Sequence, residues 1–138
     1  LVPLFSYAKD HYYRVFFQCS RGKKAADHVL SQHAILDGAG PLWTGQLWDA
    51  KLAAKMAKKN TVSENQAFLD LLAEESRVDV VGIHHIHAIA KKHKLETLPK
   101  QALLIEKILK KKKKVAVSHL DPVALRSTIS EKELVRLL

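Results

Sequence analysis

Apolar residues recur with the period of an α-helix in the last third of the chain. The spacing i, i+1, i+4 and i+5 lays one apolar stripe along a helix that we predict over residues 100–114. The residues of this stripe are Leu104, Ile105, Ile108 and Leu109. An earlier helix is predicted over residues 83–94, and Pro99 marks the break between the two. We predict a strand and a reverse turn over residues 115–128.

Residues near the N-terminus alternate with the period of a β-strand. The segment 4–19 is rich in aromatic and β-branched residues, which favour strands. One set of alternating positions is the more apolar and is predicted to face the core: Tyr13, Val15, Phe17 and Cys19. A helix over residues 23–32 should turn four apolar residues inward: Ala25, Ala26, Val29 and Leu30. Residues 34–36 form a second short strand, which the Asp37–Gly38 turn pair ends.

The segment from Gly40 to Asp49 holds both tryptophans of the chain, Trp43 and Trp48. Because glycine and proline bracket them, we predict a strand or loop with both indoles packed on the N-terminal half. Three helix starts follow from capping residues, which satisfy free backbone N–H groups. They are Asp49 before a helix over residues 50–59, Ser63 with Gln66 before a third helix, and Ser130 with Glu133 before a terminal helix.

These elements predict an α/β (α+β) chain of two modules. Residues 1–76 form a small mixed sheet with helices and include the Gly-Pro-Leu-Trp segment. Residues 77–138 run in the order helix, basic helix, strand and turn, which is typical of a winged-helix module. The sequence shows no internal repeat.

The chain is strongly basic. Its 23 Lys and Arg against 14 Asp and Glu give a formal charge of +9, which favours polyanionic partners. The sequence has no apolar run of about 18 residues and no apolar signal segment, so we expect a soluble protein of the cytoplasm and no membrane partner. Four lysines recur along one edge of the predicted basic helix: Lys100, Lys107, Lys111 and Lys114. A lysine run can also be a solvated helix face, and this alternative stays open.

Several kinds of chemistry lack their usual sequence signature. The chain contains no Gly-x-Gly-x-x-Gly segment, no Walker loop and no Gly-x-Ser-x-Gly elbow, so no nucleotide-type cofactor and no catalytic residue are predicted. His84, His85 and His87 crowd one helix turn, but metal sites usually recruit ligands from a second segment, and we expect no metal. Cys19, the single cysteine, is predicted to be a small buried apolar residue.

With these kinds of chemistry set aside, a nucleic-acid-binding surface is the interpretation that remains. Lysines would give affinity that depends on salt, and four further side chains could stack on or hydrogen-bond to unpaired bases: Tyr12, Trp43, His119 and Arg126. For Tyr12 and Trp43 core packing is the alternative.

Three segments resemble the C-terminal half of the tRNA guanine-26 N2-dimethyltransferase family. They are Asp10 to Phe16, Gly40 to Trp43 with Gly45 and Trp48, and Ser118 to Pro122 with Arg126, Ser127 and Thr128. The resemblance implies a parent enzyme that uses S-adenosylmethionine to methylate N2 of a guanine in tRNA. It also implies that the catalytic motif and the cofactor site belong to an N-terminal methyltransferase domain, so that this chain alone is a tRNA-recognition part and not catalytic.

The chain departs from the family pattern at a few positions. Ser118, Leu120 and Ala124 stand where the family usually has Thr, Phe and Gly, and Ala124 makes a positive φ at that turn less favourable. Many archaeal members carry a four-cysteine zinc insertion before Gly-Pro-Leu-Trp. Only residues 37–39 fill that gap here, so the resemblance implies no structural zinc.

The function we predict is tRNA binding by the C-terminal domain of such a methyltransferase. The tRNA-binding residues predicted for phosphates are Lys107, Lys110, Lys111 and Lys114. Those predicted for the backbone or bases near the target guanine are Arg14, His119, Arg126 and Thr128. Two rivals stay open: a winged-helix DNA-binding regulator, and a packing domain that only stabilises its catalytic partner.

Overall fold

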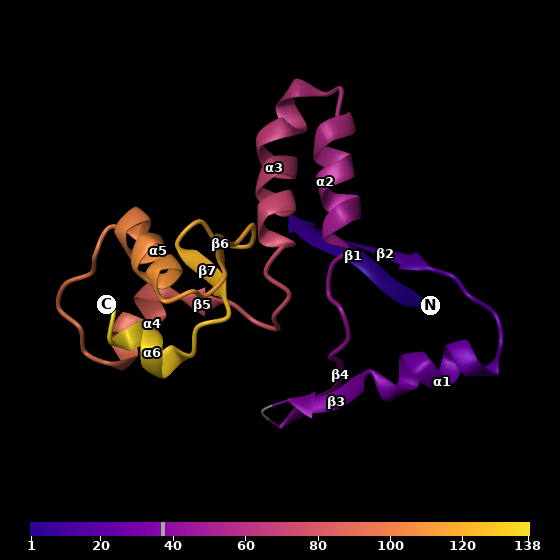
Figure 1. Ribbon diagram of the computed structural model, residues 1–138, viewed down its shortest axis with the longest axis horizontal. Helices are drawn as coiled ribbons and strands as arrows, with labels where there is room; N and C mark the ends of the chain where they lie inside the picture. The colour runs from indigo at the N-terminus through magenta and orange to yellow at the C-terminus, as the bar shows by residue number, and fades with distance from the viewer. Residues whose placement is uncertain (37) are drawn as a thin grey trace.

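The computed structural model describes residues 1–36 and 38–138, so the turn predicted at Asp37 lies outside the described residues. The chain folds into two lobes (Figure 1). The N-terminal lobe contains β1 (Val2–Lys9), β2 (Tyr12–Gln18), α1 (Lys23–Ser31), β3 (His33–Leu36), β4 (Ala39–Trp43), α2 (Ala50–Lys59), the short 3-10 helix η1 (Ser63–Asn65) and α3 (Gln66–Glu75). The C-terminal lobe contains β5 (His84–His85), α4 (Ile86–Lys92), α5 (Gln101–Lys110), β6 (Val115–Val117), β7 (Ala124–Ser127) and α6 (Glu131–Val135).

The predicted fold class, α/β with small sheets and helices, is confirmed. The sheets within the described residues are antiparallel: β1 pairs with β2, β3 pairs with β4, and the third sheet has the order β5-β7-β6. No helix in residues 1–36 and 38–138 is both long and apolar enough to cross a membrane.

Each lobe has its own apolar cluster. In the first, the aromatic rings of Phe5 and Trp48 lie 5.7 Å apart against α2 and α3. The second joins Ile129, which follows β7, with buried residues of α4, α5, β7 and α6: Ile86, Ile89, Leu104, Ile108, Leu125 and Leu134. Helix α3 belongs to the first cluster through Leu72 and also contacts β6. The division into modules at residue 76 therefore stays a prediction.

The prediction for segment 4–19 was wrong in its inward face. The segment is a hairpin that turns at Asp10, where φ is 52°, and Phe5, opposite Phe16, faces the core of the lobe. Tyr13, Val15 and Phe17 lie on the other face and are exposed. Cys19 is exposed as well. Alternation shows that the two faces differ, whereas the packing of α2 and α3 decides which one is covered.

Helix α1 also differs from its prediction, because none of its residues is buried. The apolar residues expected to point inward find no core among the described residues, and Leu30 is exposed.

Pairing with β7 shortens the helix predicted over residues 83–94. His84 pairs with Leu125 and His85 with Ala124, so α4 begins only at Ile86. The helix predicted over residues 100–114 ends at Lys110, and Lys112 adopts a left-handed φ of 56°. The lysine edge expected along one helix therefore continues into a loop.

Two of the three helix-capping predictions are confirmed, and one is wrong. Asp49 accepts hydrogen bonds from the N–H groups of Lys51 and Leu52, and Ser130 with Glu133 forms the capping box, as predicted. The box predicted at Ser63 is wrong. The Gln66 side chain instead donates to the Ala57 carbonyl and to Asp70, because α2 packs beside α3.

Candidate nucleic-acid interface

The C-terminal end of α5 carries the highest density of positive charge in the chain. Five consecutive lysines run from Lys110 at the end of the helix to Lys114 at the start of β6. The helix ends near Lys110, and its free carbonyl groups favour cationic side chains there. Four of the five are exposed, and only Lys113 is half-buried. This loop, residues 110–114, is called the lysine loop below.

Two of these lysines have acidic partners. Lys110 forms an ion pair with Glu106, one helical turn earlier, at 2.6 Å. Lys113 lies 3.6 Å from Glu133 of α6. Within the described residues, Lys111, Lys112 and Lys114 have no carboxylate partner. Their ammonium groups are therefore available to an external anion.

The lysines predicted as one stripe have separate positions. The ammonium group of Lys107 is half-buried and donates to the carbonyl oxygen of Leu137 at 2.8 Å. Lys111 caps the end of α5, and Lys114 lies beyond the left-handed Lys112. The backbone N–H of Lys114 donates to Oγ1 of Thr128, and the Thr128 N–H donates to the Lys114 carbonyl. Thr128 thus fixes the backbone of the lysine loop at its end.

A cleft of about 380 Å³ adjoins Lys114. Arg77, which follows α3, lines this cleft together with Lys114 and Leu109. The sequence reasoning did not select Arg77 as a binding residue. Its position directly after a helix gave no periodic signal, and only the packing of α3 beside β6 brings it near the lysine loop.

Arg14 lies in the other lobe. It projects from β2, its guanidinium carbon lies 5.3 Å from the Tyr12 ring centre, and it is exposed. Arg14 lines a second cleft, of about 350 Å³, with Trp48 and Arg126. Of the residues predicted for tRNA, the structure thus brings Lys114 together with Thr128, and Arg14 together with His119 and Arg126.

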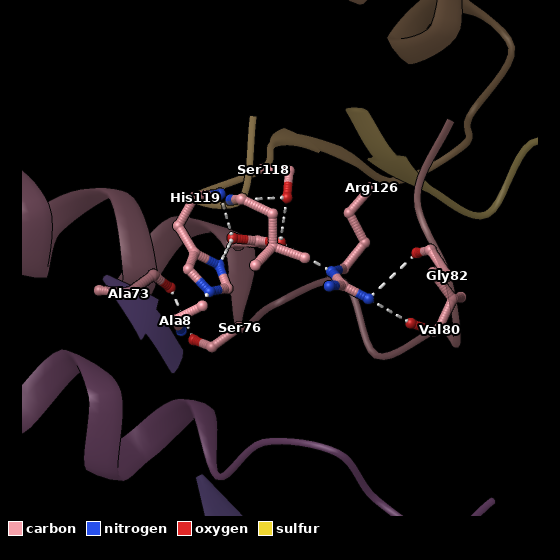
Figure 2. Close-up of polar contacts among 10 residues, drawn as sticks. Ala8, Ala73, Ser76, Val80, Gly82, Ser118, His119 and Arg126 are labelled. Atoms are coloured by element: carbon pink, nitrogen blue, oxygen red, sulfur yellow. Dashed lines mark hydrogen bonds and ion pairs between the residues drawn. The ribbon is translucent and has the colours of Figure 1, made fainter. Parts of the chain in front are cut away.

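His119 and Arg126 lie in the interior, where both bind Glu75 (Figure 2). Nδ1 of His119 lies 2.7 Å from Oε2 of Glu75, and the His119 backbone N–H donates to the same oxygen at 2.8 Å. The other carboxylate oxygen accepts from Nε of Arg126 at 2.9 Å and from the Ser118 hydroxyl at 3.1 Å. One carboxylate therefore accepts four hydrogen bonds from the β6–β7 segment.

The same network reaches two other segments. The backbone N–H of Ala8, in β1, donates to Nε2 of His119 at 3.1 Å. This contact places the ring hydrogen of His119 on Nδ1, from which it is donated to Glu75. Nη1 of Arg126 donates to the carbonyl groups of Val80 and Gly82. We call this set, Glu75 with Ser118, His119 and Arg126, the Glu75 hub.

The Glu75 hub determines the ionisation of its carboxylate. Burial alone would raise the pKa of Glu75, but the hydrogen bonds from His119 and Arg126 outweigh it and hold the pKa below its ordinary value. Glu75 is fully buried, so the charge of Arg126 is neutralised inside the protein. The sequence reasoning missed Glu75. It lies three residues after Leu72 and seven after Phe68, so its position on the inward stripe of α3 was the available signal.

The histidines of the predicted cluster bind protein groups. Nε2 of His84 lies 2.9 Å from the Ile129 carbonyl oxygen, and His85 pairs with Asp121 at 3.0 Å. His93 and Lys92 both bind Glu131, and the hydrogen bond from Lys92 lowers the pKa of Glu131 to about 2. These contacts tie β5 to the segments on either side of β7, and the end of α4 to α6. The tRNA contacts predicted for individual residues stay a prediction.

The tryptophan segment makes its own contacts. Trp48 is buried beside Phe5, and its ring centre lies 5.5 Å from that of His119. Trp43 packs against His33 and donates its indole N–H to the Gln46 carbonyl. Trp48 therefore belongs to the core of its lobe, whereas Trp43 is half-buried and lies outside that apolar cluster. The choice between base stacking and core packing for Trp43 stays open.

Comparison with known proteins identifies the family. The sequence profile described as "TRM: N2,N2-dimethylguanosine tRNA methyltransferase" matches residues 33–138. The chain therefore belongs to the N2,N2-dimethylguanosine tRNA methyltransferase family, as its sequence motifs indicated.

Individual members of this family are also similar to the chain. The tRNA (guanine(26)-N(2))-dimethyltransferase of Methanocaldococcus jannaschii is 29% identical over 157 residues, which cover 98% of this chain and 42% of the relative. The tRNA (guanine(26)-N(2)/guanine(27)-N(2))-dimethyltransferase of Aquifex aeolicus is 26% identical and covers 72% of this chain and 34% of the relative. The chain thus spans less than half the length of the relatives it matches.

A solved structure has the same fold. The complex of Trm1 from Pyrococcus horikoshii with S-adenosyl-L-methionine matches with a TM-score of 0.85 and 21% identity. The match covers 98% of this chain and 43% of that chain.

Proposed function

We propose that this chain is the tRNA-recognition part of an S-adenosylmethionine-dependent tRNA (guanine-26 N2)-dimethyltransferase of the cytoplasm, and that the catalytic part lies outside these 138 residues. Family membership supports the reaction class. The matched relatives are more than twice as long as the region they share with this chain, which supports a separate catalytic part.

The residues of this chain do not fit an S-adenosylmethionine site of the usual kind. Such sites, like other nucleotide sites, use a glycine-rich turn between a parallel strand and a helix. The sequence holds no such glycine pattern, and the described strands pair antiparallel. We therefore assign the cofactor and the methyl transfer to the N-terminal domain.

The observation that carries the proposal is the lysine loop, in which three ammonium groups have no carboxylate partner in the part of the chain that the structure describes. Phosphate contacts by lysine release counterions from the nucleic acid and supply affinity without regard to sequence. Lys111 and Lys114 bind phosphates in this proposal, and Arg77 adds a cation in the adjoining cleft. Lys107 and Lys110 contribute to the positive potential of this surface, although each already has a partner in the protein.

The arrangement of α3 together with the C-terminal lobe supports the same surface. A helix, a short strand, two helices and two strands follow one another from α3 to β7, and the sheet order is β5-β7-β6. This is the order of a winged-helix module, in which the helix at the position of α5 is laid against nucleic acid.

Two of the predicted contact residues have a different role in the proposal. His119 and Arg126 hold the β6–β7 segment against α3 through Glu75, so they position the interface rather than contact tRNA. Arg14 is exposed in the neighbouring cleft and keeps its predicted role as a contact to backbone or base. Thr128 holds the end of the lysine loop.

The test is a gel shift with labelled tRNA and two matched double variants. Lys111→Glu with Lys114→Glu should weaken tRNA binding at least tenfold at low salt, because two phosphate contacts become repulsive. The control, Lys55→Glu with Lys58→Glu on the exposed face of α2, makes the same charge change elsewhere. Equal effects of the two pairs would show that only net charge matters and would refute the assigned surface.

The order of helices and strands in the winged-helix arrangement also suits a second function, that of a DNA-binding winged-helix regulator. Competition in the same gel shift separates the two functions. Unlabelled tRNA should displace labelled tRNA at a much lower concentration than duplex DNA does. Stronger displacement by duplex DNA would favour the regulator.

A further inference from the structure

The cleft beside the lysine loop has apolar walls. Its volume of about 380 Å³ lies in the range of small-ligand pockets. Val78 and Ala116, which are both buried, line the cleft. Leu109 belongs to the predicted apolar stripe of α5, yet its side chain is 54% exposed and also lines the cleft. The cleft, called the Arg77 cleft below, therefore offers an apolar surface against which a flat base can pack.

Two cationic side chains line the same cleft, those of Arg77 and Lys114. Both are exposed, and neither forms an ion pair with a carboxylate of residues 1–36 or 38–138. The backbone of Lys114 is held by Thr128 at its N–H and at its carbonyl group. The Arg77 cleft therefore presents positive charge on a fixed backbone, to which a phosphate can bind.

The cleft also contains a carboxylate, that of Glu74. Glu74 is exposed and lies in the last turn of α3. A negative charge is unfavourable there, because the free carbonyl groups at the end of a helix favour cations. Arg77 follows three residues later, but no ion pair of the described residues involves Glu74. The fold therefore does not compensate the charge of Glu74, which leaves the carboxylate available to hydrogen-bond donors of a ligand.

A carboxylate in a phosphate-binding cleft discriminates among the four bases. Glu74 repels phosphate, so a nucleotide gains from this side chain only through N–H donors on its base. Guanine presents two adjacent donors, N1–H and the N2 amino group, and the two oxygens of a carboxylate can accept both. In adenine and cytosine, the ring nitrogen beside the amino group is an acceptor, and uracil places carbonyl oxygens on both sides of its N–H. The donor edge of guanine is accessible only in an unpaired nucleotide.

We propose that the Arg77 cleft binds an unpaired guanosine of tRNA other than the guanosine that is methylated. The base packs against Leu109, and Glu74 accepts hydrogen bonds from its N1 and N2 positions. Lys114 and Arg77 bind the adjoining phosphate. The inference rests on the proposed function for the identity of the RNA. It adds a base-specific contact to a lysine loop that by itself binds phosphates without regard to sequence.

Kethoxal footprinting of tRNA tests the proposal, because kethoxal reacts with N1 and N2 of unpaired guanine. The natural polypeptide that carries this sequence is compared with its Glu74→Gln variant, which keeps the shape of the side chain but replaces one acceptor by a donor. The matched control is Glu64→Gln, at an exposed position in η1. Each protein is added at a concentration that saturates the tRNA, so that differences in affinity do not alter the footprint.

We expect the wild type and Glu64→Gln to protect at least one such guanosine about fivefold or more, as suits a bidentate base contact. This guanosine should regain its free reactivity with Glu74→Gln. A footprint that is the same for the wild type and Glu74→Gln would overturn the proposal. Loss of protection at every guanosine would overturn it as well, because Glu74 would then act on binding as a whole.

A tRNA with inosine at the protected position provides a second measurement, since inosine lacks the N2 amino group. It should bind the wild type about fivefold more weakly than the unmodified tRNA does, and Glu74→Gln without this difference. An equal loss for both proteins would refute the contact to Glu74. The proposed function is judged separately by Lys111→Glu with Lys114→Glu. Weaker tRNA binding by that double variant, together with a footprint indifferent to Glu74→Gln, would leave the proposed function intact and refute the guanosine site alone.

Discussion

Nδ1 of His119 lies 2.7 Å from Oε2 of Glu75, a hydrogen bond that spans 44 residues of sequence. Glu75 ends α3, and His119 follows β6, so this contact fastens the two lobes to each other. His119 also accepts from the Ala8 N–H in β1. The segment Ser118–His119–Leu120–Asp121–Pro122, which gave the chain part of its family resemblance, therefore serves in this structure to join the lobes.

Replacement of Glu75 by Gln should destabilise the fold. The substitution keeps the shape of the side chain but removes the charge that neutralises the buried Arg126. Loss of one partner of a buried pair costs roughly 3–5 kcal/mol. Urea unfolding followed by circular dichroism measures the change. The control is Glu74→Gln at the adjacent exposed position, which should change stability by less than about 0.5 kcal/mol.

The stabilising effect of Glu75 should depend on pH in a defined direction. Its pKa is lower in the folded protein than the ordinary value of 4.5, so the folded state favours the ionised form. The stabilisation is therefore complete well above pH 4.5 and is lost as the pH falls through the folded pKa. The difference in unfolding free energy between the wild type and Glu75→Gln should shrink as the pH is lowered from 6 to 3. A constant difference over this range would contradict the assigned ionisation.

The salt dependence of tRNA binding should identify individual phosphate contacts. Each lysine that contacts a phosphate contributes about 0.7–0.9 to the slope of log affinity against log salt concentration. Lys111→Gln with Lys114→Gln should therefore lower the magnitude of this slope by roughly 1.4–1.8. Lys55→Gln with Lys58→Gln should leave the slope unchanged. Fluorescence anisotropy with labelled tRNA at several salt concentrations provides the measurement.

Gly45 should tolerate no side chain next to Trp43. A Cβ atom at Gly45 would lie 2.5 Å from Cζ2 of the Trp43 indole, so Gly45→Ala forces the indole or the loop to move. Overpacking of this kind costs about 1–3 kcal/mol. The penalty should be smaller in a Trp43→Phe background, because phenylalanine lacks the ring atoms nearest to Gly45. Thermal unfolding of the four proteins of this double-mutant cycle measures the coupling.

Equilibrium dialysis with labelled S-adenosylmethionine tests whether the cofactor site lies outside the 138-residue chain. The 138-residue chain should bind no cofactor, since its residues provide no glycine-rich cradle. The polypeptide that includes the N-terminal domain should bind it. Cofactor binding by the 138-residue chain alone would refute the assignment of the cofactor site to the N-terminal domain.

The sequence predicted much of the local structure because local structure depends on neighbouring residues. The helix over residues 50–59 begins after Asp49 as its capping side chain indicated, and the apolar stripe of α5 is buried through Leu104 and Ile108. Short sequence motifs also indicated the family to which the chain belongs. Element ends were less predictable, since His84 and His85 leave the predicted helix only because β7 offers hydrogen bonds from 39 to 41 residues away in sequence.

The role of charged residues was the least accessible from sequence. Periodicity marked Lys107 and Lys111 as one exposed edge, but the left-handed Lys112 ends the helix before Lys114. His119 and Arg126 looked like binding residues because their types suit nucleic acid. Their actual partner, Glu75, lies more than 40 residues away, and no local pattern connects them.

The amino-acid sequence by itself determined the fold class, the positive charge and the family, because each of these depends on residue types and short-range spacing. Tertiary structure alone decided which face of the β1–β2 hairpin is covered, which lysines remain without a partner, and which polar side chains meet at Glu75. These properties depend on contacts between segments distant in sequence, and the free energy of burying a charge or an apolar face exists only once those segments have come together.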